Sequence, residues 1–268
     1  MIGFNYLGKL GQLGNQMFQY ASLKGIANNN GYNYCIPNHN EIFEDGLGNR
    51  LHIELFKPFV LENFSDLNVQ LIDKDRPVVQ EGSFHFNEEL FNNCPDWVCL
   101  HGFFQTEKYF KNIEQEIRED FRFNDDILIP CKEMMDEFGE PPLSLHIRRG
   151  DFLINSANHH NLGLDYYEKA LAEFPMEVPV LIFSDDPEWC SKQELFADDR
   201  FLVAEGNSPY VDMCLMSLCE GHIIANSSFS WWGAWLANSQ KVVAPSVWFG
   251  PNNAHLDIKD LYLDHWEV

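Results

Sequence analysis

The chain has 268 residues, of which 45% are hydrophobic and 14% aromatic, enough apolar material for one large domain or two small ones and unlike a disordered composition. It carries 41 acidic and 18 basic residues, a formal net charge of −23. This balance excludes a protein that coats nucleic acid or an anionic membrane, because such proteins need a basic face, whereas a small anionic ligand needs only a local basic cluster.

The first half of the chain predicts a strand at 2–6, then a turn with glycines at positions 8, 11 and 14, then a helix over 15–28 that ends at NNNG. A strand at 32–37 and a helix at 107–120 follow. Residues 41–80 give no clear assignment. The segment DDILIPCKEMMDEFGEPP ends in a double proline, which predicts a domain boundary near residue 140.

The second half alternates regularly between strand-like and helical segments. The strands are predicted at 143–147, 180–183, 201–204, 222–225 and 242–244, and the helices at 165–174, 187–196, 210–220 and 229–237. Such alternation with short connections is typical of an α/β domain, in which helices cover a parallel sheet. Ligands of these sheets bind at the carboxyl ends of the strands.

Polar groups directly follow three of these strands. Arg148 and Arg149, the only adjacent basic pair in the sequence, follow the strand at 143–147. The groups after the strands at 180–183 and 222–225 are Asp185, Asp186, Asn226, Ser227 and Ser228. Because the carboxyl ends of parallel strands meet at one edge, we expect these groups to share a site, and together they suit a nucleoside diphosphate.

Each group has a role in such a site and also a plainer alternative. The paired guanidinium forks can hold phosphate oxygens, or form surface ion pairs. Ser227 and Ser228 can cradle a phosphate with the N-terminus of the following helix, or act as ordinary helix caps. Asp185 or Asp186 can accept the two N–H donors of guanine, which adenine does not offer, or cap a helix.

Two further features favour the plainer interpretation. Trp231, Trp232 and Trp235 recur at helical spacing, which favours the core over a surface that stacks on a sugar. The sequence DKD at 73–75 resembles the DxD metal pair of many sugar transferases, but its polar neighbours favour a solvated turn. No other cluster has a convincing metal-ligand spacing, so we expect no metal and no cofactor.

At this point four ordered motifs carry a family resemblance. HIRRGDF resembles the HxRR signature of inverting α-1,2/α-1,6-fucosyltransferases, and GQLGNQMFQYA resembles the N-terminal segment of the α-1,2-fucosyltransferase family, glycosyltransferase family 11. FSDDPEW and NSSFSWWGAWLA match later blocks of that family in order and spacing. The resemblance extends from Gly8 to about Pro245 and is weakest over 41–80.

The resemblance implies a GT-B-type α/β fold of two facing Rossmann-like domains with mostly parallel sheets: residues 1–140 on the acceptor side and 141–268 binding GDP-fucose. It implies that Arg148 contacts the β-phosphate, that an acid of the SDD block reads guanine, that Asn15 lies near the transferred sugar, and that no metal is needed. The residues expected to bind the donor are His146, Arg148, Arg149, Asp185, Asp186, Asn226, Ser227, Ser228, Gly14 and Gln16.

The expected reaction moves L-fucose from GDP-β-L-fucose to the 2-hydroxyl of a terminal galactose, with inversion. We expect Arg148, Asp151 and Asn15 to be catalytic, with Arg148 stabilising the departing diphosphate in place of a metal. Candidates for the base are Asp151, His159 and His160, although Asp151 can instead orient the arginines through a salt bridge. Some α-1,6 relatives have a glutamate after the HxRR block, whereas FLINSANHHNLG here has no carboxylate, so the base is not assigned.

The sequence also bears on location. Seven cysteines, an odd number without a CxxC pair, suggest reduced and mostly buried thiols. The N-terminus lacks the regions of a signal peptide, and no apolar run approaches the ~20 residues of a spanning helix. We therefore expect a cytoplasmic protein without a membrane span, with attachment to the inner face of the membrane left open.

Three rival functions remain open. A transferase of the same fold with another GDP-sugar or acceptor is the first, and a non-catalytic module that binds sugar nucleotides is the second. A dinucleotide oxidoreductase is the most distant, because GKLGQLG has the spacing GxxGxxG rather than GxGxxG. The acceptor is expected to be a galactose-containing oligosaccharide or lipid-linked glycan, and no nucleic-acid partner is expected.

Overall fold

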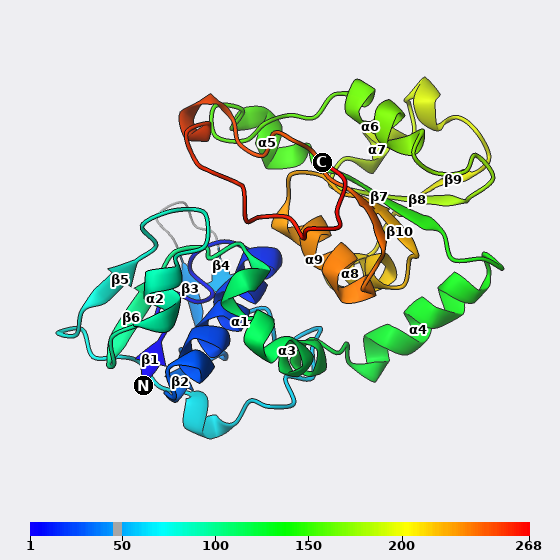
Figure 1. The fold of residues 1–268 in the computed structure, drawn as a ribbon. Helices are drawn as coiled ribbons and strands as arrows, with labels where there is room; N and C mark the ends of the chain where they lie inside the picture. Colours follow the sequence, from blue (N-terminus) through cyan, green and yellow to red (C-terminus); the bar gives the residue numbers. More distant parts are fainter. Residues whose placement is uncertain (45–49) are drawn as a thin grey trace. The chain divides into compact units, whose positions relative to one another are not determined.

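The chain divides into two compact units in a computed structural model that describes residues 1–44 and 50–268 (Figure 1). Unit 1 comprises Met1–Asn124 and Asp257–Leu263, and unit 2 comprises Asp125–Leu256 and Asp264–Val268. The division falls at residue 124 and not near residue 140, where the double proline suggested it. The physical reason is that the helix α4 (Asp125–Asp136) packs against a helix of unit 2, α8 (Pro209–Ser217).

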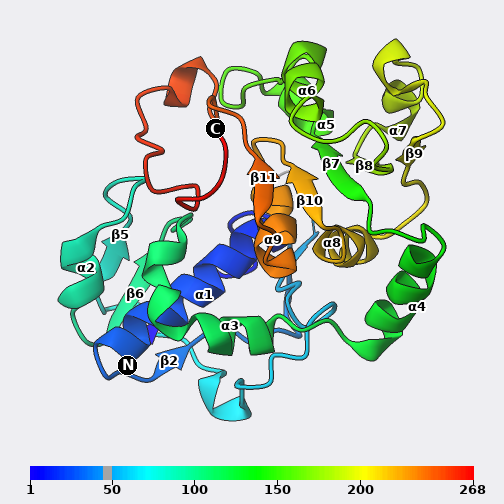
Figure 2. The same ribbon diagram turned by 45° about the vertical axis from the view of Figure 1, so that its right-hand side comes forward.

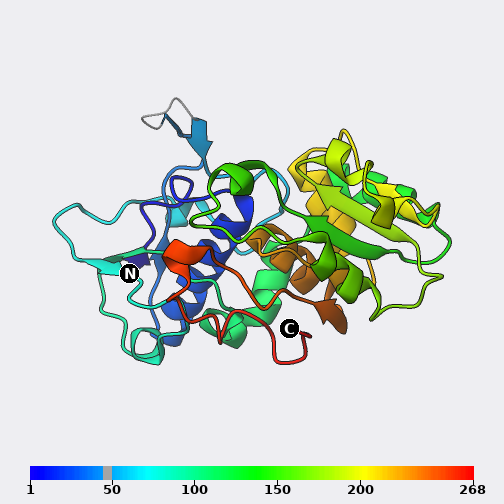
Figure 3. The same cartoon turned by 90° about the horizontal axis from the view of Figure 1, so that it is seen from above.

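Unit 1 is built on a parallel four-stranded sheet in the order β2-β1-β6-β5. The strands are β1 (Ile2–Gly3), β2 (Tyr34–Cys35), β5 (Val78–Gln80) and β6 (Val98–His101). The two predicted strands of this half are present but shorter, and β5 and β6 were not predicted. A separate antiparallel ribbon, β3 (Ile42–Glu44) and β4 (Arg50–His52), lies within the segment that the sequence left unassigned (Figure 3).

The long helix α1 (Leu13–Asn29) is the centre of unit 1 and is buried along almost its whole length. It packs against β1, β2, α2 (Glu88–Asn92) and the 3-10 turns η2 (Glu107–Tyr109) and η3 (Lys111–Ile113). Gly25 permits the close approach, because a side chain there would overlap the carbonyl of Tyr109. The helix predicted at 107–120 is therefore divided into η2, η3 and α3 (Glu114–Asp120). A further turn, η1 (Asp66–Asn68), completes the unit.

Unit 2 contains a parallel five-stranded sheet in the order β11-β10-β7-β8-β9. All five strands were predicted to within two residues; they are β7 (Leu143–Ile147), β8 (Val180–Ser184), β9 (Phe201–Val203), β10 (Gly221–Ile223) and β11 (Lys241–Val243). The central strand β7 is buried at every residue, because neighbours lie on both sides and helices cover both faces. This arrangement confirms the α/β class and parallel sheet expected from the sequence.

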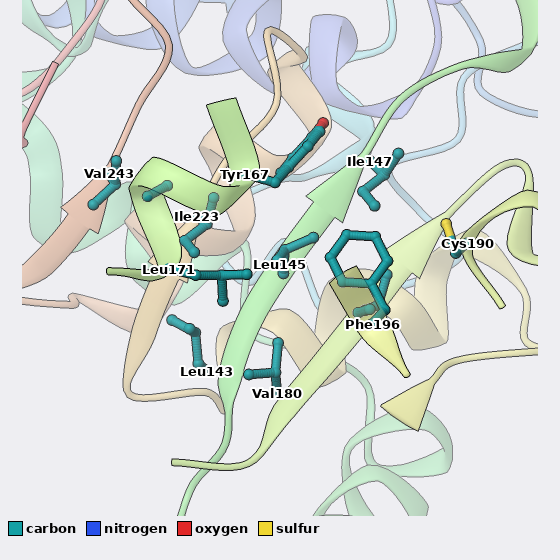
Figure 4. Packing of buried hydrophobic residues seen from close by; sticks show 12 residues of the cluster. Leu143, Leu145, Ile147, Tyr167, Leu171, Val180, Cys190, Phe196, Ile223 and Val243 are labelled. Carbon is teal, nitrogen blue, oxygen red and sulfur yellow. The ribbon is translucent and has the colours of Figure 1, made fainter. Parts of the chain in front are cut away.

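The helices of unit 2 form two layers. One face of the sheet packs on α6 (Leu164–Leu171) and the segment of α7 (Pro187–Cys190), through the buried cluster that includes Leu145, Tyr167 and Ile182 (Figure 4). On the other face α8 and α9 (Ser228–Ala237) pack side by side (Figure 2). The remaining elements are α5 (Gly150–Ile154), η4 (Glu194–Phe196) and η5 (Pro251–Asn253).

Two expectations about buried residues are confirmed. Trp231, Trp232 and Trp235 of α9 are each at most 1% exposed, so they belong to the core. All seven cysteines are buried as well. In the described part of the chain, no helix combines the length and the apolar character that crossing a membrane would require.

Candidate active site

Three polar groups predicted at strand ends lie on neighbouring strands of unit 2. Because β7 lies between β10 and β8, the loop with Arg148 and Arg149 is flanked by the loop of Asp185 and Asp186 and by the segment 226–228. The register is in phase, with Ile147 of β7 opposite Ser184 of β8. The parallel sheet thus places a guanidinium pair at the middle of its carboxyl edge.

Arg148 is held from two sides by carboxylates. Its Nη2 donates to Asp151 Oδ1 at 2.6 Å, and its Nη1 lies 3.1 Å from Asp185 Oδ2. The guanidinium also lies 5.4 Å from the centre of the Phe152 ring. The two carboxylates differ in exposure, since the side chain of Asp185 is 25% exposed and that of Asp151 is 57% exposed. The side chain of Arg148 itself remains 22% exposed.

Arg149 is held by an ion pair and by a stacked aromatic ring. Its Nε donates to Asp186 Oδ2 at 3.0 Å, and its guanidinium stacks on the Trp189 ring at 3.8 Å from the ring centre. Its backbone N–H donates to Asp185 Oδ1 at 2.8 Å. Stacking and ion pairing together leave a planar guanidinium little rotational freedom. Sequence reasoning missed Trp189, although it stands three residues after Asp186 in the motif SDDPEW.

The predicted guanine-reading acids therefore already contact the arginines. Asp185 bridges Arg148 and the backbone of Arg149, and Asp186 combines its ion pair with a helix cap, accepting from the Trp189 N–H at 3.2 Å. The capping alternative weighed for this pair is thus observed at Asp186, while the reading of guanine stays a prediction. The two guanidinium groups and the three carboxylates that contact them carry a formal charge of −1, so the cluster is preassembled and electrostatically compensated.

His146 lies on β7, just before the arginine pair, and is buried. Burial, assisted by the charge of Arg148, lowers its pKa to about 3, so the imidazole is neutral at physiological pH. Its Nδ1 finds no hydrogen-bond partner among the described residues. The ring contacts Phe229 at the start of α9, with the ring centres 5.8 Å apart.

The predicted residues at the start of α9 have different structural roles. Asn226 is buried, and its Nδ2 donates to the carbonyls of His160 and Trp248 at 2.8 Å each. Ser227 is the N-cap of α9, and its hydroxyl accepts from the Phe229 N–H at 3.3 Å. The N-cap alternative weighed for the serines is thus observed at Ser227. Asn226 ties two loops together through its amide, which the sequence did not indicate.

The three candidate bases of unit 2 have different partners. The ring of His159 stacks on Phe152 with centres 4.1 Å apart, and burial lowers the pKa of His159 further than the nearby Asp151 raises it. Asp151 accepts the strong hydrogen bond from Arg148, which is the orienting alternative considered for it. His160 contributes its backbone carbonyl to Asn226.

The remaining predicted residues, Gly14, Asn15 and Gln16, lie in the first turn of α1 in unit 1. Asn15 Oδ1 accepts from Gln105 Nε2 at 2.7 Å. Gln16 is buried, and its amide donates to the His52 carbonyl at 3.1 Å and accepts from a backbone N–H at 2.8 Å. Gln16 therefore braces a neighbouring loop of unit 1, a role that sequence reasoning missed.

The described residues contain no group of three or more histidine, cysteine, aspartate or glutamate side chains able to hold a metal ion. The DKD sequence at 73–75 lies at an exposed turn, as its polar surroundings predicted.

The sequence profile described as "Glycosyl transferase family 11" matches residues 2–268. An alpha-1,2-colitosyltransferase of Escherichia coli is 35% identical, over 89% of this chain and 90% of that protein. The Escherichia coli O-antigen biosynthesis glycosyltransferase WbnK is 36% identical over 66% of this chain and 64% of its own. Galactoside alpha-(1,2)-fucosyltransferase 1 of Sus scrofa is 24% identical over 87% of this chain and 65% of its own.

Two groups of solved structures share the fold. POFUT1 in complex with GDP-fucose matches with a TM-score of 0.59 and 11% identity, over 92% of this chain and 97% of that one. NodZ alpha-1,6-fucosyltransferase soaked with GDP-fucose matches with a TM-score of 0.51 and 15% identity, over 88% of this chain and 92% of that one. At these identities the similarity shows the fold, which is that of GT-B glycosyltransferases.

Proposed function

The chain belongs to glycosyl transferase family 11, and from this premise we propose that it transfers L-fucose, or a closely related 6-deoxyhexose, from a GDP-linked donor to the 2-hydroxyl of a galactose, with inversion. The observation that carries the proposal is the Arg148–Arg149 pair at the middle of the carboxyl edge of a parallel sheet. Breaking a sugar–diphosphate bond leaves negative charge on the diphosphate, and two preorganised guanidinium groups are suited to stabilise it.

In this proposal Arg148 binds the phosphate at which the bond breaks. Of the two carboxylates that contact Arg148, Asp185 is the more buried and keeps its ion pair, whereas the phosphate displaces the more exposed Asp151. In the protein without donor, Asp151 already accepts a hydrogen bond from the Arg148 guanidinium. The phosphate therefore replaces this hydrogen bond, and the guanidinium keeps its orientation. Arg149 carries a second positive charge, fixed by Trp189, and neutral His146 offers a ring N–H.

The other donor contacts are proposed from the same edge and from unit 1. The N-terminus of α9 with Ser227 and Ser228 holds the second phosphate, with Asn226 fixing the segment from behind. Asp185 or Asp186 reads guanine with the lone pairs that the arginines leave unused. Gly14, Asn15 and Gln16 belong to the turn of unit 1 that we propose to face the transferred sugar. The candidates for the base remain Asp151, once the phosphate has displaced it from Arg148, His159 and His160.

Two sugars are candidates for the one that is transferred from the donor. One relative is described as a colitosyltransferase and another as a fucosyltransferase, and L-colitose is L-fucose without the 3-hydroxyl. The likeness to an O-antigen biosynthesis glycosyltransferase supports a bacterial polysaccharide repeat, lipid-linked or free, as acceptor, and a cytoplasmic place of action.

We expect purified protein given GDP-fucose or GDP-colitose with a panel of β-galactosides to yield a product heavier by one deoxysugar, with unchanged rate in EDTA. Mass spectrometry identifies the sugar, and NMR establishes the linkage to the galactose 2-hydroxyl. Transfer that stops in EDTA would contradict the proposed role of the arginine pair in place of a metal. GDP binding without transfer from either donor would favour the non-catalytic alternative.

Replacing Gly150 by alanine is expected to weaken GDP binding about tenfold, which corresponds to about 1.4 kcal/mol, a usual effect of a single substitution. An added Cβ would lie 2.5 Å from Asp185 Oδ2, so the carboxylate must move away from Arg148. Isothermal titration with GDP measures the effect. Gly82→Ala is the matched control, since a Cβ there meets no atom within 4 Å. If Gly150→Ala and Gly82→Ala bound GDP with equal affinity, Asp185 would not be part of the donor site.

A further inference from the structure

The helix α1 carries three polar side chains on a face that is largely buried. Asn15, Gln19 and Ser22 follow one another at helical spacing, so they lie on one side of the helix, and we call them the polar stripe. Gln19 and Ser22 are fully buried, whereas Asn15, at the N-terminal end of the stripe, is partly exposed. Apolar side chains would fill such a face without the cost of burying polar groups, so packing alone does not explain the stripe.

The partner of the polar stripe is the segment 102–105, which follows β6 at the carboxyl edge of the sheet of unit 1. Gln19 Nε2 donates to the Gly102 carbonyl at 3.2 Å. The Ser22 hydroxyl donates to the Phe104 carbonyl, also at 3.2 Å. The buried part of the stripe therefore binds the backbone of this segment and fixes its position against α1.

The segment returns to the helix through Gln105, whose side chain is only 7% exposed. Its Nε2 donates to Asn15 Oδ1 at 2.7 Å. Because an asparagine amide accepts at one end and donates at the other, a hydrogen bond to Oδ1 determines which way the amide points. The Asn15 Nδ2 lies over Gly11, where φ is +84° and a Cβ would come within 2.3 Å of it. Gln105 at the oxygen and the glycine turn at the nitrogen thus hold this partly exposed amide in one orientation.

Glu81, directly after β5, binds the same segment through two backbone N–H groups. Its Oε2 accepts from the Phe103 N–H at 2.7 Å, and its Oε1 accepts from the Phe104 N–H at 2.9 Å. Gly102 permits this approach, because a Cβ there would lie 2.4 Å from that of Glu81. Burial raises the pKa of Glu81 to about 7 although both hydrogen bonds lower it, so the charged carboxylate is kept here at a cost to folding. Such a cost is typical of a residue that serves a functional site.

We infer that Glu81 and Gln105 are positioning residues of the sugar transfer: through the segment 102–105 they hold the Asn15 amide in the orientation in which it meets the substrate. The inference rests on the proposed function for the substrate, and on the hydrogen bonds of unit 1 for the positioning. Glu81 fixes the backbone of the segment, and Gln105 passes that restraint on to Asn15. Neither Glu81 nor Gln105 belongs to a motif that carried the family resemblance.

The test is Gln105→Met, which nearly keeps the size of the side chain and removes the donor to Asn15. We expect kcat for sugar transfer to fall roughly tenfold, the effect of losing one hydrogen bond that acts in the transition state. The KM for the GDP-sugar and the affinity for GDP should stay within about twofold, because the diphosphate is proposed to bind unit 2. Gln115→Met is the matched control, since Gln115 also belongs to unit 1 but is exposed and donates to Glu119.

A double-mutant cycle with Asn15→Ala separates positioning from general damage to the fold. If Gln105 acts through Asn15, Gln105→Met should lower kcat by less than about twofold once residue 15 is alanine. Glu81→Gln, which replaces one acceptor oxygen by an amino group, is the second variant and should lose most of its effect in the same background. Additive losses, or an unchanged kcat in variants with a wild-type melting profile by circular dichroism, overturn the inference.

NMR separates failure of the inference from failure of the proposed function. In isotope-labelled protein without substrate, the side-chain amide signals of Asn15 are assigned by their absence from Asn15→Ala. A shift of these signals in Gln105→Met and Glu81→Gln, but not in Gln115→Met, supports the positioning even where no donor yields transfer, and only the proposed function then fails. Unchanged signals overturn the positioning and leave the donor chemistry of unit 2 intact.

Discussion

Replacing Arg148 by lysine is expected to lower kcat/KM for sugar transfer by roughly 10²- to 10³-fold, the usual effect of removing one preorganised donor to a developing negative charge. Lysine keeps the positive charge, so a large loss of kcat/KM would show that the planar arrangement of the guanidinium donors is required. In the structure, separate nitrogens of one planar group reach Asp151 and Asp185. A lysine ammonium is a single point that cannot keep the contact to Asp185 and hold a phosphate in the same plane.

Steady-state kinetics with the GDP-sugar as varied substrate measures this effect, and circular dichroism verifies the fold. The matched control is Arg200→Lys, because Arg200 also belongs to unit 2 but its guanidinium donates to the backbone carbonyls of Pro175 and Met176 instead of contacting the arginine cluster. We expect the control to keep kcat/KM within about twofold. Near-normal turnover by Arg148→Lys would exclude Arg148 as the donor to the departing diphosphate.

The contrast between the two halves shows what the sequence can predict. In unit 2, β7 was predicted with its observed bounds, because a strand buried on both faces is a continuous apolar run closed by polar residues. In unit 1, β5 and β6 were missed, since strands of three or four residues are too short to show a period. The helix predicted at 107–120 is divided where it passes α1 at Gly25, a tertiary contact that no local pattern reports.

The candidate site shows the same limit at the level of side chains. Sequence placed polar groups after three strands, and parallel topology then brought them to one edge. It could not assign Asp185 and Asp186 to the arginines, because those pairings depend on where two loops from different strands meet. The stacking of Arg149 on Trp189 is equally non-local.

The second large effect concerns stability and not catalysis. Unit 1 buries the ion pair of Lys24 and Asp120, with side chains only 5% and 0% exposed. Asp120 also accepts from the hydroxyl of Tyr20 at 3.0 Å and from the backbone and side-chain nitrogens of Asn63 at 2.9 and 3.1 Å. Burial raises the pKa of Tyr20 well above its usual value, so its hydroxyl keeps the proton that it donates. This carboxylate therefore joins α1, α3 and the loop at Asn63.

Asp120→Asn is expected to destabilise the protein by ~3–5 kcal/mol, because it leaves the Lys24 ammonium buried without its counter-charge. For a chain of this size the melting temperature should fall by on the order of 10 °C. Differential scanning calorimetry measures the loss. Adding Lys24→Met to Asp120→Asn should restore part of it, since the unpaired charge is then removed.

The matched control for this pair is Glu116→Gln. Glu116 also faces Lys24, at 3.9 Å, but its side chain is 49% exposed, and exposed pairs contribute only about 0–1 kcal/mol. If Asp120→Asn and Glu116→Gln lowered the melting temperature equally, burial would not be what makes the Asp120 contact important. The buried network would then be one surface-like ion pair among many, and the union of α1 with α3 would have to rest on their apolar contacts alone.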